Sequence, residues 1–400
     1  MSAAPALIAH VVYRFAIGGL ENGLVNLINR LPAKAWRHLV VSLTDIDPVF
    51  TGRVERDDVD YVSLHKASGH AFPLYPTMFR LFRQYRPAIV HTRNLAALEA
   101  SAPAWAARIP ARVHGEHGRD VEDPDGSSKR HQWVRRAFRP FVSRYVALST
   151  DLNRYLQERV GVSAHRVEQI CNGVDTERFR PTTGGRAPID DCPFREAGLW
   201  LMGTVGRMET IKNQTSLARA FVRALELHPE ARHRMRLVMI GNGRLKAQVE
   251  AILDEANARQ LAWLPGERSD IARIMQGLDC FVLPSLAEGV SNTILEAMAT
   301  GLPVVATRVG ANPELLESEL TGRLVEASDE GAMATEIVRY FHDPSTARRH
   351  GWAGRERVER HFSVERMVER YHLLYTDLIR AQGADAPNPR ASASQRPTNS

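Results

Sequence analysis

A chain of 400 residues is too long for one ordinary core, so we expect two domains of roughly 150 to 200 residues each. The formal net charge of +6 and the 44% share of hydrophobic residues are typical of a soluble globular protein, and no apolar run approaches the roughly 18 residues that a membrane-spanning helix needs. Three widely spaced cysteines argue against a disulfide framework, and the opening segment lacks the basic start of a signal peptide. We therefore expect a cytoplasmic protein.

The first half of the chain alternates apolar runs with helical patterns. Six runs are apolar almost throughout, as expected of strands buried on both faces of a sheet: LIAHVVYRF, HLVVSLT, VDYVSL, AIVHTR, ARVHGEH and RYVALS. A glycine turn, Gly18 and Gly19, follows the first run and precedes a helical segment. We predict a Rossmann-like domain over residues 1–180.

The second half repeats this pattern more clearly. Five strand-like runs separated by helices follow residue 200, and the first of these helices carries apolar residues at helical spacing: Leu217, Ala220, Phe221, Ala224 and Leu225. We predict a second Rossmann-like domain over residues 196–362. A segment rich in Pro and Gly, residues 181–195, is the predicted linker.

The last helical pattern, over residues 363–383, has an apolar stripe that must pack on something: Met367, Tyr371, Leu374, Tyr375 and Leu378. We expect this helix to cross back to the first domain. The composition of residues 384–400 predicts a disordered tail. The fold class is therefore α/β, with two Rossmann-like domains facing a central cleft, where ligands bind outside the carboxyl ends of the strands.

Several turns of the second domain are expected to line this cleft. Arg207 and Lys212 follow the first strand, where two cations can neutralise a departing diphosphate; the alternative is a pair of solvated surface cations. Gly241 permits close backbone approach, but a simple tight turn explains it equally well. Arg268 lies in LPGERSD, which we interpret as an edge for a nucleotide base.

The segment EGVSNTILEAMATGLPVV, residues 288–305, carries two glutamates near a helix start. In one interpretation, Ser291 is an N-cap and Glu296 only complements the helix dipole. In the other, the free N–H groups of the helix start receive phosphates, Glu296 binds a ribose diol and Glu288 binds a sugar hydroxyl. We favour the second, because several turns on one edge suit the same ligand. Four neighbouring residues are predicted to contact the same ligand: Gly289, Val290, Ser291 and Asn292.

Two positions of the first domain are expected to meet the same ligand. Gly19 allows a close approach to the ligand or to the facing domain. His117 ends the run RVHGEH, and a neutral imidazole there can hydrogen-bond a sugar hydroxyl or the reacting centre. The alternative is a structural histidine, and His114 is a neighbour that could be mistaken for it.

These segments resemble those of the retaining glycosyltransferases of family 4, whose two Rossmann-like domains make up the GT-B fold. The resemblance rests on four stretches: EGVSNTILEAMATGLPVVAT, GTVGRMETIKN, ICNGVDTERFRP and GGLENGLVNLINRLP. Within the family, RVHGEHGRDVEDPDG is most similar to sugar transferases of bacterial exosortase and exopolysaccharide (PEP-CTERM-associated) clusters.

The resemblance implies roles for individual residues of the second domain. It assigns Arg207 and Lys212 to the donor diphosphate, Glu296 to the donor ribose and Glu288 to the transferred sugar. It also implies reaction with retention and without a metal. We read no Asp-x-Asp pair at a strand end, so we expect the cations to replace Mg²⁺ in neutralising charge.

For the first domain, the resemblance implies that the chain binds the acceptor there, places Gly19 near the diphosphate and places His117 near the transferred sugar. The sequence departs from the family at Val290 and Ser291, where an aromatic residue and a proline are common, which leaves the transferred sugar open.

The expected partners follow from this interpretation. We expect no cofactor, a UDP- or GDP-sugar as donor substrate, a glycan or polyprenyl-linked acceptor, no nucleic acid, and a monomer or homodimer. Two alternatives stay open: a nucleotide-sugar epimerase on the same fold, and a non-catalytic nucleotide-sugar-binding protein. A dehydrogenase is disfavoured, because no G-x-G-x-x-G follows a strand and opens a helix.

A basic segment, residues 129–145, interleaves arginines with aromatic residues. We predict that it docks the protein on the anionic inner face of the cytoplasmic membrane; the alternative is an ordinary surface helix whose arginines cover apolar neighbours. The predicted docking residues are Lys129, Arg130, Trp133, Arg135, Arg136 and Arg139.

Overall fold

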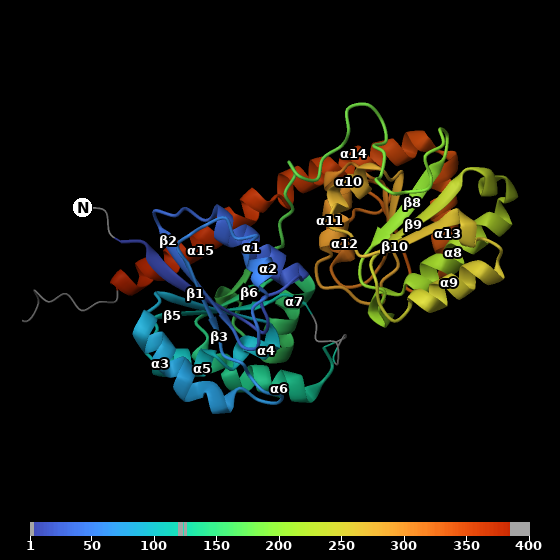
Figure 1. Cartoon of the computed structure of the whole chain (residues 1–400). Helices are drawn as coiled ribbons and strands as arrows, with labels where there is room; N and C mark the ends of the chain where they lie inside the picture. Colours follow the sequence, from blue (N-terminus) through green and yellow to red (C-terminus); the bar gives the residue numbers. More distant parts are fainter. Residues whose placement is uncertain (1–3, 119–122, 124–125, 385–400) are drawn as a thin grey trace, which may run out of the picture.

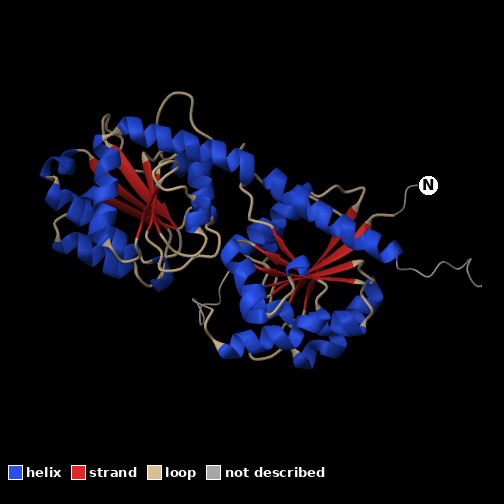
Figure 2. Ribbon diagram, turned by 180° about the vertical axis from the view of Figure 1, so that it is seen from behind, coloured by secondary structure: helices blue, strands red, loops and turns tan. Residues whose placement is uncertain are grey.

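The computed structural model describes residues 4–118, 123 and 126–384. Two α/β domains lie side by side, and each contains a sheet with helices on both of its faces (Figures 1 and 2). This arrangement confirms the predicted fold class, two Rossmann-like domains of parallel strands.

The first domain is built on a sheet of seven parallel strands in the order β3-β2-β1-β4-β5-β6-β7. The chain runs outward from β1 to β3 and then returns to the other side of β1 with β4. The strands are β1 (Ala6–Val12), β2 (Trp36–Ser42), β3 (Val59–Ser63), β4 (Ile89–Arg93), β5 (Ala111–Glu116), β6 (Arg144–Ala147) and β7 (Val167–Gln169).

Helices connect these strands and bury one apolar stripe each against the sheet. The first helix shows why: its buried residues recur at helical spacing and so face one side. The helices of this domain are α1 (Gly19–Arg30), α2 (Pro48–Thr51), α3 (Tyr75–Tyr85), α4 (Asn94–Leu98), α5 (Ser101–Ala106), α6 (Lys129–Phe138) and α7 (Thr150–Arg154). A short helical turn, Arg139–Phe141, continues α6.

The second domain contains six parallel strands in the order β10-β9-β8-β11-β12-β13. The strands are β8 (Trp200–Val205), β9 (Met235–Ile240), β10 (Ala262–Gly266), β11 (Cys280–Leu283), β12 (Val304–Thr307) and β13 (Arg323–Val325). The helices of this domain are α8 (Gln214–Leu227), α9 (Lys246–Glu255), α10 (Ile271–Gln276), α11 (Asn292–Ala299), α12 (Asn312–Leu315), α13 (Glu330–His342) and α14 (Pro344–His361). The last helix, α15 (Val364–Ala384), packs on the first domain. The five apolar residues predicted to form one face of α8 are all buried.

The chain crosses between the domains twice, and the two crossings lie against each other. The backbone N–H of Val174 donates to the carbonyl of Phe362 at 2.9 Å, and the N–H of Val364 donates to the carbonyl of Val174 at 3.0 Å. Gly173 is required here, because a Cβ atom would lie 2.6 Å from the Cα of Val364. The predicted linker, residues 181–195, follows this crossing and packs on the second domain.

The C-terminal helix α15 runs back along the first domain, as predicted (Figure 1). The Trp36 indole N–H donates to His372 Nδ1 at 2.8 Å, and the Tyr375 hydroxyl lies 2.7 Å from His91 Nδ1. The packing of α15 therefore attaches the C-terminal end of the second domain to the first domain. In the part of the chain that the structure describes, no helix combines the length and the apolar character needed to cross a membrane.

Candidate active site

The cleft lies where the strand order of each sheet reverses. Those switch points fall between β1 and β4 in the first domain and between β8 and β11 in the second. The turns that follow these strands supply Gly19, Asn94, Lys212 and Glu288, and all four line one cavity of about 300 Å³, which we call the smaller compartment. A cavity of about 530 Å³, the larger compartment, adjoins it through the shared residues Asn172 and Asn292.

Glu288 is held by two donors at the end of the second sheet. Its Oε1 atom accepts from Lys212 Nζ at 2.6 Å and from Ser285 Oγ at 2.6 Å, and its side chain is 7% exposed. An ammonium group carries three N–H donors, so Lys212 can bind the carboxylate and still donate to an anion. The two residues that we predicted to act on different parts of a donor are therefore paired with each other.

His117 faces the smaller compartment from the first domain. Its backbone N–H donates to Asn94 Oδ1 at 2.8 Å, whereas both ring nitrogens are buried and have no hydrogen-bond partner among the described residues. Burial lowers the pKa of His117 to about 3, and the positive charge of Arg93 adds to this effect. The imidazole is therefore neutral, with an unused donor and an unused acceptor in a site where leaving them unsatisfied is costly.

His114, two residues earlier, has its hydrogen-bond partners in the core of the domain. Its Nδ1 lies 2.8 Å from Thr92 Oγ1, and its Nε2 lies 3.3 Å from Glu116 Oε1. It is the structural histidine of the pair, and His117 is the one that lines the compartment.

Asn292 joins the two domains at the boundary between the compartments. Its Nδ2 donates to the carbonyl of Gly19 at 3.3 Å, and its Oδ1 accepts from Asn172 Nδ2 at 2.9 Å. The preceding Ser291 is the N-cap of α11, since its Oγ accepts from the N–H of Ile294 at 3.3 Å. The start of α11 therefore lies against the first domain.

The backbones of the two domains also approach each other beside Glu288. A Cβ atom on Gly289 would lie 2.8 Å from the carbonyl oxygen of His117, so only glycine fits this contact. Val290, the next residue, is almost fully buried and lines the smaller compartment.

The larger compartment holds Glu296, one turn into α11. This side chain is half-buried, and burial raises its pKa to about 7, against the opposing effect of Arg178. Arg268 lines the same compartment, but its guanidinium is held by carboxylates: it donates to Asp270 at 2.9 and 2.8 Å and to Asp191 at 3.2 Å.

Arg207 and Gly241 line neither compartment. Arg207 follows β8 as predicted, and its side chain is exposed. Gly241 has a φ of +131°, and a Cβ atom there would lie 2.0 Å from the carbonyl oxygen of Gly206. The tight packing of two turns thus explains Gly241, which favours the simpler of the two interpretations that we had left open.

Sequence reasoning missed several residues of the site, and four polar or charged ones matter most for its chemistry. Asn94 and Asn172 line the smaller compartment, Ser285 holds Glu288, and Arg178 lies near Glu296. Asn172 and Arg178 belong to the stretch ICNGVDTERFRP that supports the family resemblance, so a signal for both was present. Asn94 carries a local signal too, since it directly follows a predicted strand.

Two expectations need correction. Asp45 and Asp47 form an Asp-x-Asp pair shortly after β2, although we expected none at a strand end. Asp47 caps α2, where its side chain accepts from the N–H of Val49 at 2.9 Å.

Arg135 was predicted to dock on a membrane, but it is 3% exposed and its Nε donates to Glu116 Oε1 at 2.6 Å. Its charge neutralises a buried carboxylate and is not available to lipid.

Arg136 and Arg139 also have intramolecular partners. Both guanidinium groups donate to backbone carbonyls of the segment Tyr155–Val160 and its following glycine. Lys129, Arg130 and Trp133 are exposed, and so is Arg136 despite its hydrogen bonds; Arg139 is half-buried.

Family models match both halves of the chain. Residues 17–178 match the model described as Glycosyltransferase Family 4, and residues 201–343 match the one described as Glycosyl transferases group 1. The chain therefore belongs to the glycosyltransferases that combine these two domains, in the GT-B fold.

Known proteins similar to this chain agree with that assignment. The chain is 26% identical over 309 residues to the UDP-Gal:alpha-D-GlcNAc-diphosphoundecaprenol alpha-1,3-galactosyltransferase of Escherichia coli. The aligned region covers 76% of this chain and 79% of that protein. It is 31% identical over 217 residues to the lipopolysaccharide core biosynthesis mannosyltransferase LpcC of Rhizobium leguminosarum bv. viciae, covering 52% of this chain and 59% of that protein. The crystal structure of Anabaena Alr3699/HepE in complex with UDP and glucose has the same fold, with a TM-score of 0.78 and 19% identity over 93% of this chain and 100% of that one.

Proposed function

We propose that this glycosyltransferase transfers a hexose-type sugar from a nucleotide diphosphate donor to a glycan or lipid-linked acceptor, with retention at the anomeric carbon and without a metal ion. One observation carries the proposal. Lys212 and Glu288 from one domain face Gly19 and His117 from the other across a single cavity, at the switch points of both sheets. A donor bound there has a cation, a carboxylate and a neutral imidazole within one site.

The diphosphate is the group that most needs stabilisation. When the bond between the anomeric carbon and the diphosphate breaks, negative charge grows on the departing oxygen while the acceptor hydroxyl forms the new bond. Lys212 and the free N–H groups at the start of α11 supply positive potential at this point. In the proposal, the exposed side chain of Arg207 turns toward the bound diphosphate and adds to this potential.

The sugar and the nucleoside take the two compartments. In the proposal, Glu288 and His117 bind hydroxyls of the transferred sugar in the smaller compartment, where the unused donor and acceptor of His117 support this role. Glu296 binds the ribose in the larger compartment, with Arg268 beside the base. Asn292 then lies between them, next to the diphosphate.

The relatives leave the donor nucleotide and the sugar open, because one is named for UDP-galactose and another is a mannosyltransferase. A UDP- or GDP-sugar is the donor class that we propose, with a polyprenyl-linked or glycan acceptor in the synthesis of an exopolysaccharide or cell-surface polysaccharide. The diphosphoundecaprenol named for the E. coli relative supports a lipid-linked acceptor.

We also propose that the protein works on the inner face of the cytoplasmic membrane, as a peripheral protein. Lys129 and Arg130 are exposed on α6, and Trp133 on the same helix is 69% exposed. The helices α3 and α5 lie on the same side of the domain as α6 (Figure 1). They border an apolar groove of about 560 Å³ that includes Phe79 and Trp105. Exposed aromatic rings beside basic residues suit the interface of an anionic bilayer, where each basic residue contributes about 1 kcal/mol.

Two measurements test the enzymatic proposal. A screen of UDP-, GDP- and ADP-sugars should identify one donor that raises the melting temperature of the purified protein by mass action. Incubation of that donor with a panel of polyprenyl-linked and glycan acceptors should give an elongated acceptor whose new linkage keeps the anomeric configuration of the donor, at a rate unchanged by EDTA. An epimerised nucleotide sugar formed without acceptor, or donor binding with no turnover on any acceptor, would overturn the proposal in favour of an epimerase or a binding protein.

A further inference from the structure

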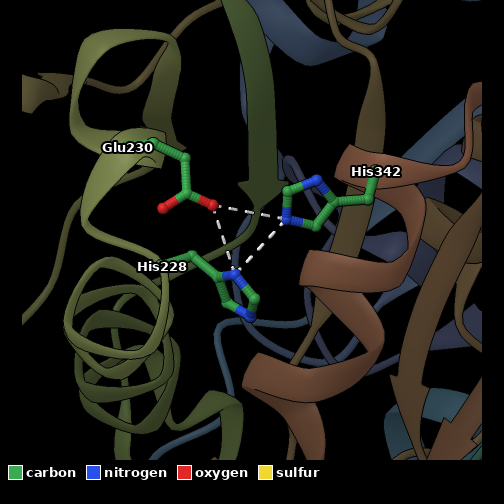
Figure 3. A group of neighbouring side chains, drawn as sticks. All are labelled: His228, Glu230 and His342. Atoms are coloured by element: carbon green, nitrogen blue, oxygen red, sulfur yellow. Dashed lines mark hydrogen bonds and ion pairs between the residues drawn. The ribbon is translucent and has the colours of Figure 1, made fainter.

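A group of three side chains, His228, Glu230 and His342, lies on the surface of the second domain, outside both compartments (Figure 3). His228 is the C-cap of α8, Glu230 lies in the helical turn Pro229–His233 that follows, and His342 is the last residue of α13. We propose that this group binds one divalent transition-metal ion, for which Zn²⁺ is the best match, and that the ion joins the ends of the two helices.

The distances between the three facing atoms carry the proposal. His228 Nδ1 lies 3.3 Å from Glu230 Oε1, His342 Nε2 lies 3.4 Å from His228 Nδ1, and His342 Nε2 lies 3.7 Å from Glu230 Oε1. Ligand atoms bound tetrahedrally to zinc at about 2.0–2.1 Å are separated from one another by about 3.3 Å. The three atoms here lie on a circle with a radius of about 2.0 Å, so an ion near its centre reaches all of them at zinc bonding distance without moving a side chain.

The donor set is the one that zinc prefers when a coordination position is left open. Two imidazole nitrogens and one carboxylate oxygen supply three of the four tetrahedral ligands, and water can take the fourth position, because the three side chains are between 37% and 60% exposed. Harder cations such as Mg²⁺ and Ca²⁺ favour oxygen ligands, so two imidazoles disfavour them.

The surrounding charges also favour a cation. Both histidines lie at the C-terminal ends of helices, where the helix dipole is negative. The nearby arginines are directed elsewhere: Arg232 and Arg234 donate to backbone carbonyls, and Arg339 is paired with Glu336.

The position of the group separates it from the sugar-transfer site. His228 and Glu230 lie in the segment that leads into β9, and His342 is the last residue of α13, whose first residue follows the end of β13; all three side chains therefore lie at the edge of the sheet where the strands begin. The compartments lie at the opposite edge, where the strands end, and α8 and α13 lie on the side of the second domain away from the first (Figure 1). A metal ion here acts as a clamp between two packed helices and takes no part in the transfer.

The test uses the full chain after dialysis against a chelator. Titration with Zn²⁺ in a calorimeter should show one equivalent bound per chain, and the melting temperature should rise with the Zn²⁺ concentration. His228→Ala and His342→Ala should each weaken binding at least tenfold and abolish the rise, and Glu230→Gln should weaken binding by a smaller factor. His233→Ala removes an exposed histidine of the same turn and should leave both measurements unchanged.

A second readout checks the ligands themselves. With Co²⁺ in place of Zn²⁺, the visible spectrum should be that of a four- or five-coordinate ion in the wild type and in His233→Ala, and should be lost in His228→Ala. The three positions are on the surface, so the variants should melt at the wild-type temperature when no metal is present. Absence of Zn²⁺ binding by the wild-type chain, or wild-type affinity in both His228→Ala and His342→Ala, would overturn the proposal.

Discussion

Lys212 Nζ lies 2.6 Å from Glu288 Oε1, and this ion pair ties the turn after β8 to the turn after β11. The Glu288 side chain is almost fully buried, whereas the Lys212 side chain is 27% exposed and lines the smaller compartment. The pair therefore does two things at once. It neutralises a charge that would be costly to bury alone, and it presents a cation to the cavity between the domains.

The first prediction concerns the stability of this pair. Lys212→Ala should lower the free energy of unfolding by about 1–3 kcal/mol, because it leaves a buried carboxylate with Ser285 as its remaining donor. Glu288→Gln should cost less, since a neutral amide can still accept from Ser285. Urea unfolding measures both values, and Lys34→Ala, which removes an exposed lysine, is the control. Equal stability of Lys212→Ala and the control would contradict the account of the pair.

The second prediction is a pH dependence caused by Glu296. Burial raises the pKa of this carboxyl group from 4.5 to about 7, so between these values the folded state binds more protons than the unfolded state. The stability that Glu296 contributes is therefore fully present below pH 4.5 and is lost as the pH rises through about 7.

Glu296→Gln should remove this component. Urea unfolding at pH 5 and pH 7.5 should show a smaller fall in stability for the variant than for the wild type, and Glu255→Gln, which changes an exposed carboxylate on α9, should behave like the wild type. An identical fall in all three proteins would show that Glu296 has an ordinary pKa.

The third prediction concerns the space beneath His117. A Cβ atom on Gly115 would lie 2.7 Å from His117 Nε2 and 3.1 Å from His91 Nε2. Gly115→Ala should therefore displace the imidazole, cost about 1–3 kcal/mol of stability by overpacking, and reduce sugar transfer. Gly184→Ala, where the new methyl group meets no atom within 4 Å, is the control. Full activity of Gly115→Ala would show that the position of the His117 ring does not matter for transfer.

The fourth prediction distinguishes the basic residues of α6 that stabilise the fold from those that bind a membrane. Burial alone would raise the pKa of Glu116, but the Arg135 guanidinium and His114 hold it well below its usual range. Arg135→Ala should therefore cost about 3–5 kcal/mol of stability by leaving that carboxylate unpaired. Arg130→Ala should leave stability unchanged but weaken co-sedimentation with anionic liposomes. Liposome binding that survives the combined loss of Lys129, Arg130 and Trp133 would place the docking surface elsewhere.

The difference between buried Arg135 and the exposed basic residues of α6 could not be predicted from the sequence. The alternation of basic and aromatic residues predicts a helix with a basic surface, but it does not say which arginine faces inward. Arg135 is buried because Glu116, at the end of β5, is positioned to receive it, and that pairing joins residues 19 positions apart. No local sequence pattern indicates this ion pair.

The same limit applies to the sheets and the site. Long apolar runs predicted six strands of the first domain and five of the second, and the two that were missed, β7 and β13, have three residues each and so show no period. Turn positions predicted Glu288, Lys212, Gly19 and His117, which the fold brings together. Gly241 is packed against a neighbouring turn, and a contact of that kind depends on strand register, which a single sequence does not reveal.

The most direct test of the account is the rate of donor turnover by Glu288→Gln and Lys212→Ala, measured with the donor that stabilises the protein and with its active acceptor. If the cavity between the domains is the transfer site, each variant should lose about 100-fold or more in kcat, the scale on which removal of one stabilising group lowers enzymatic rates. Lys34→Ala and Glu255→Gln should keep the wild-type rate. Turnover by both Glu288→Gln and Lys212→Ala at near wild-type rates would contradict the account.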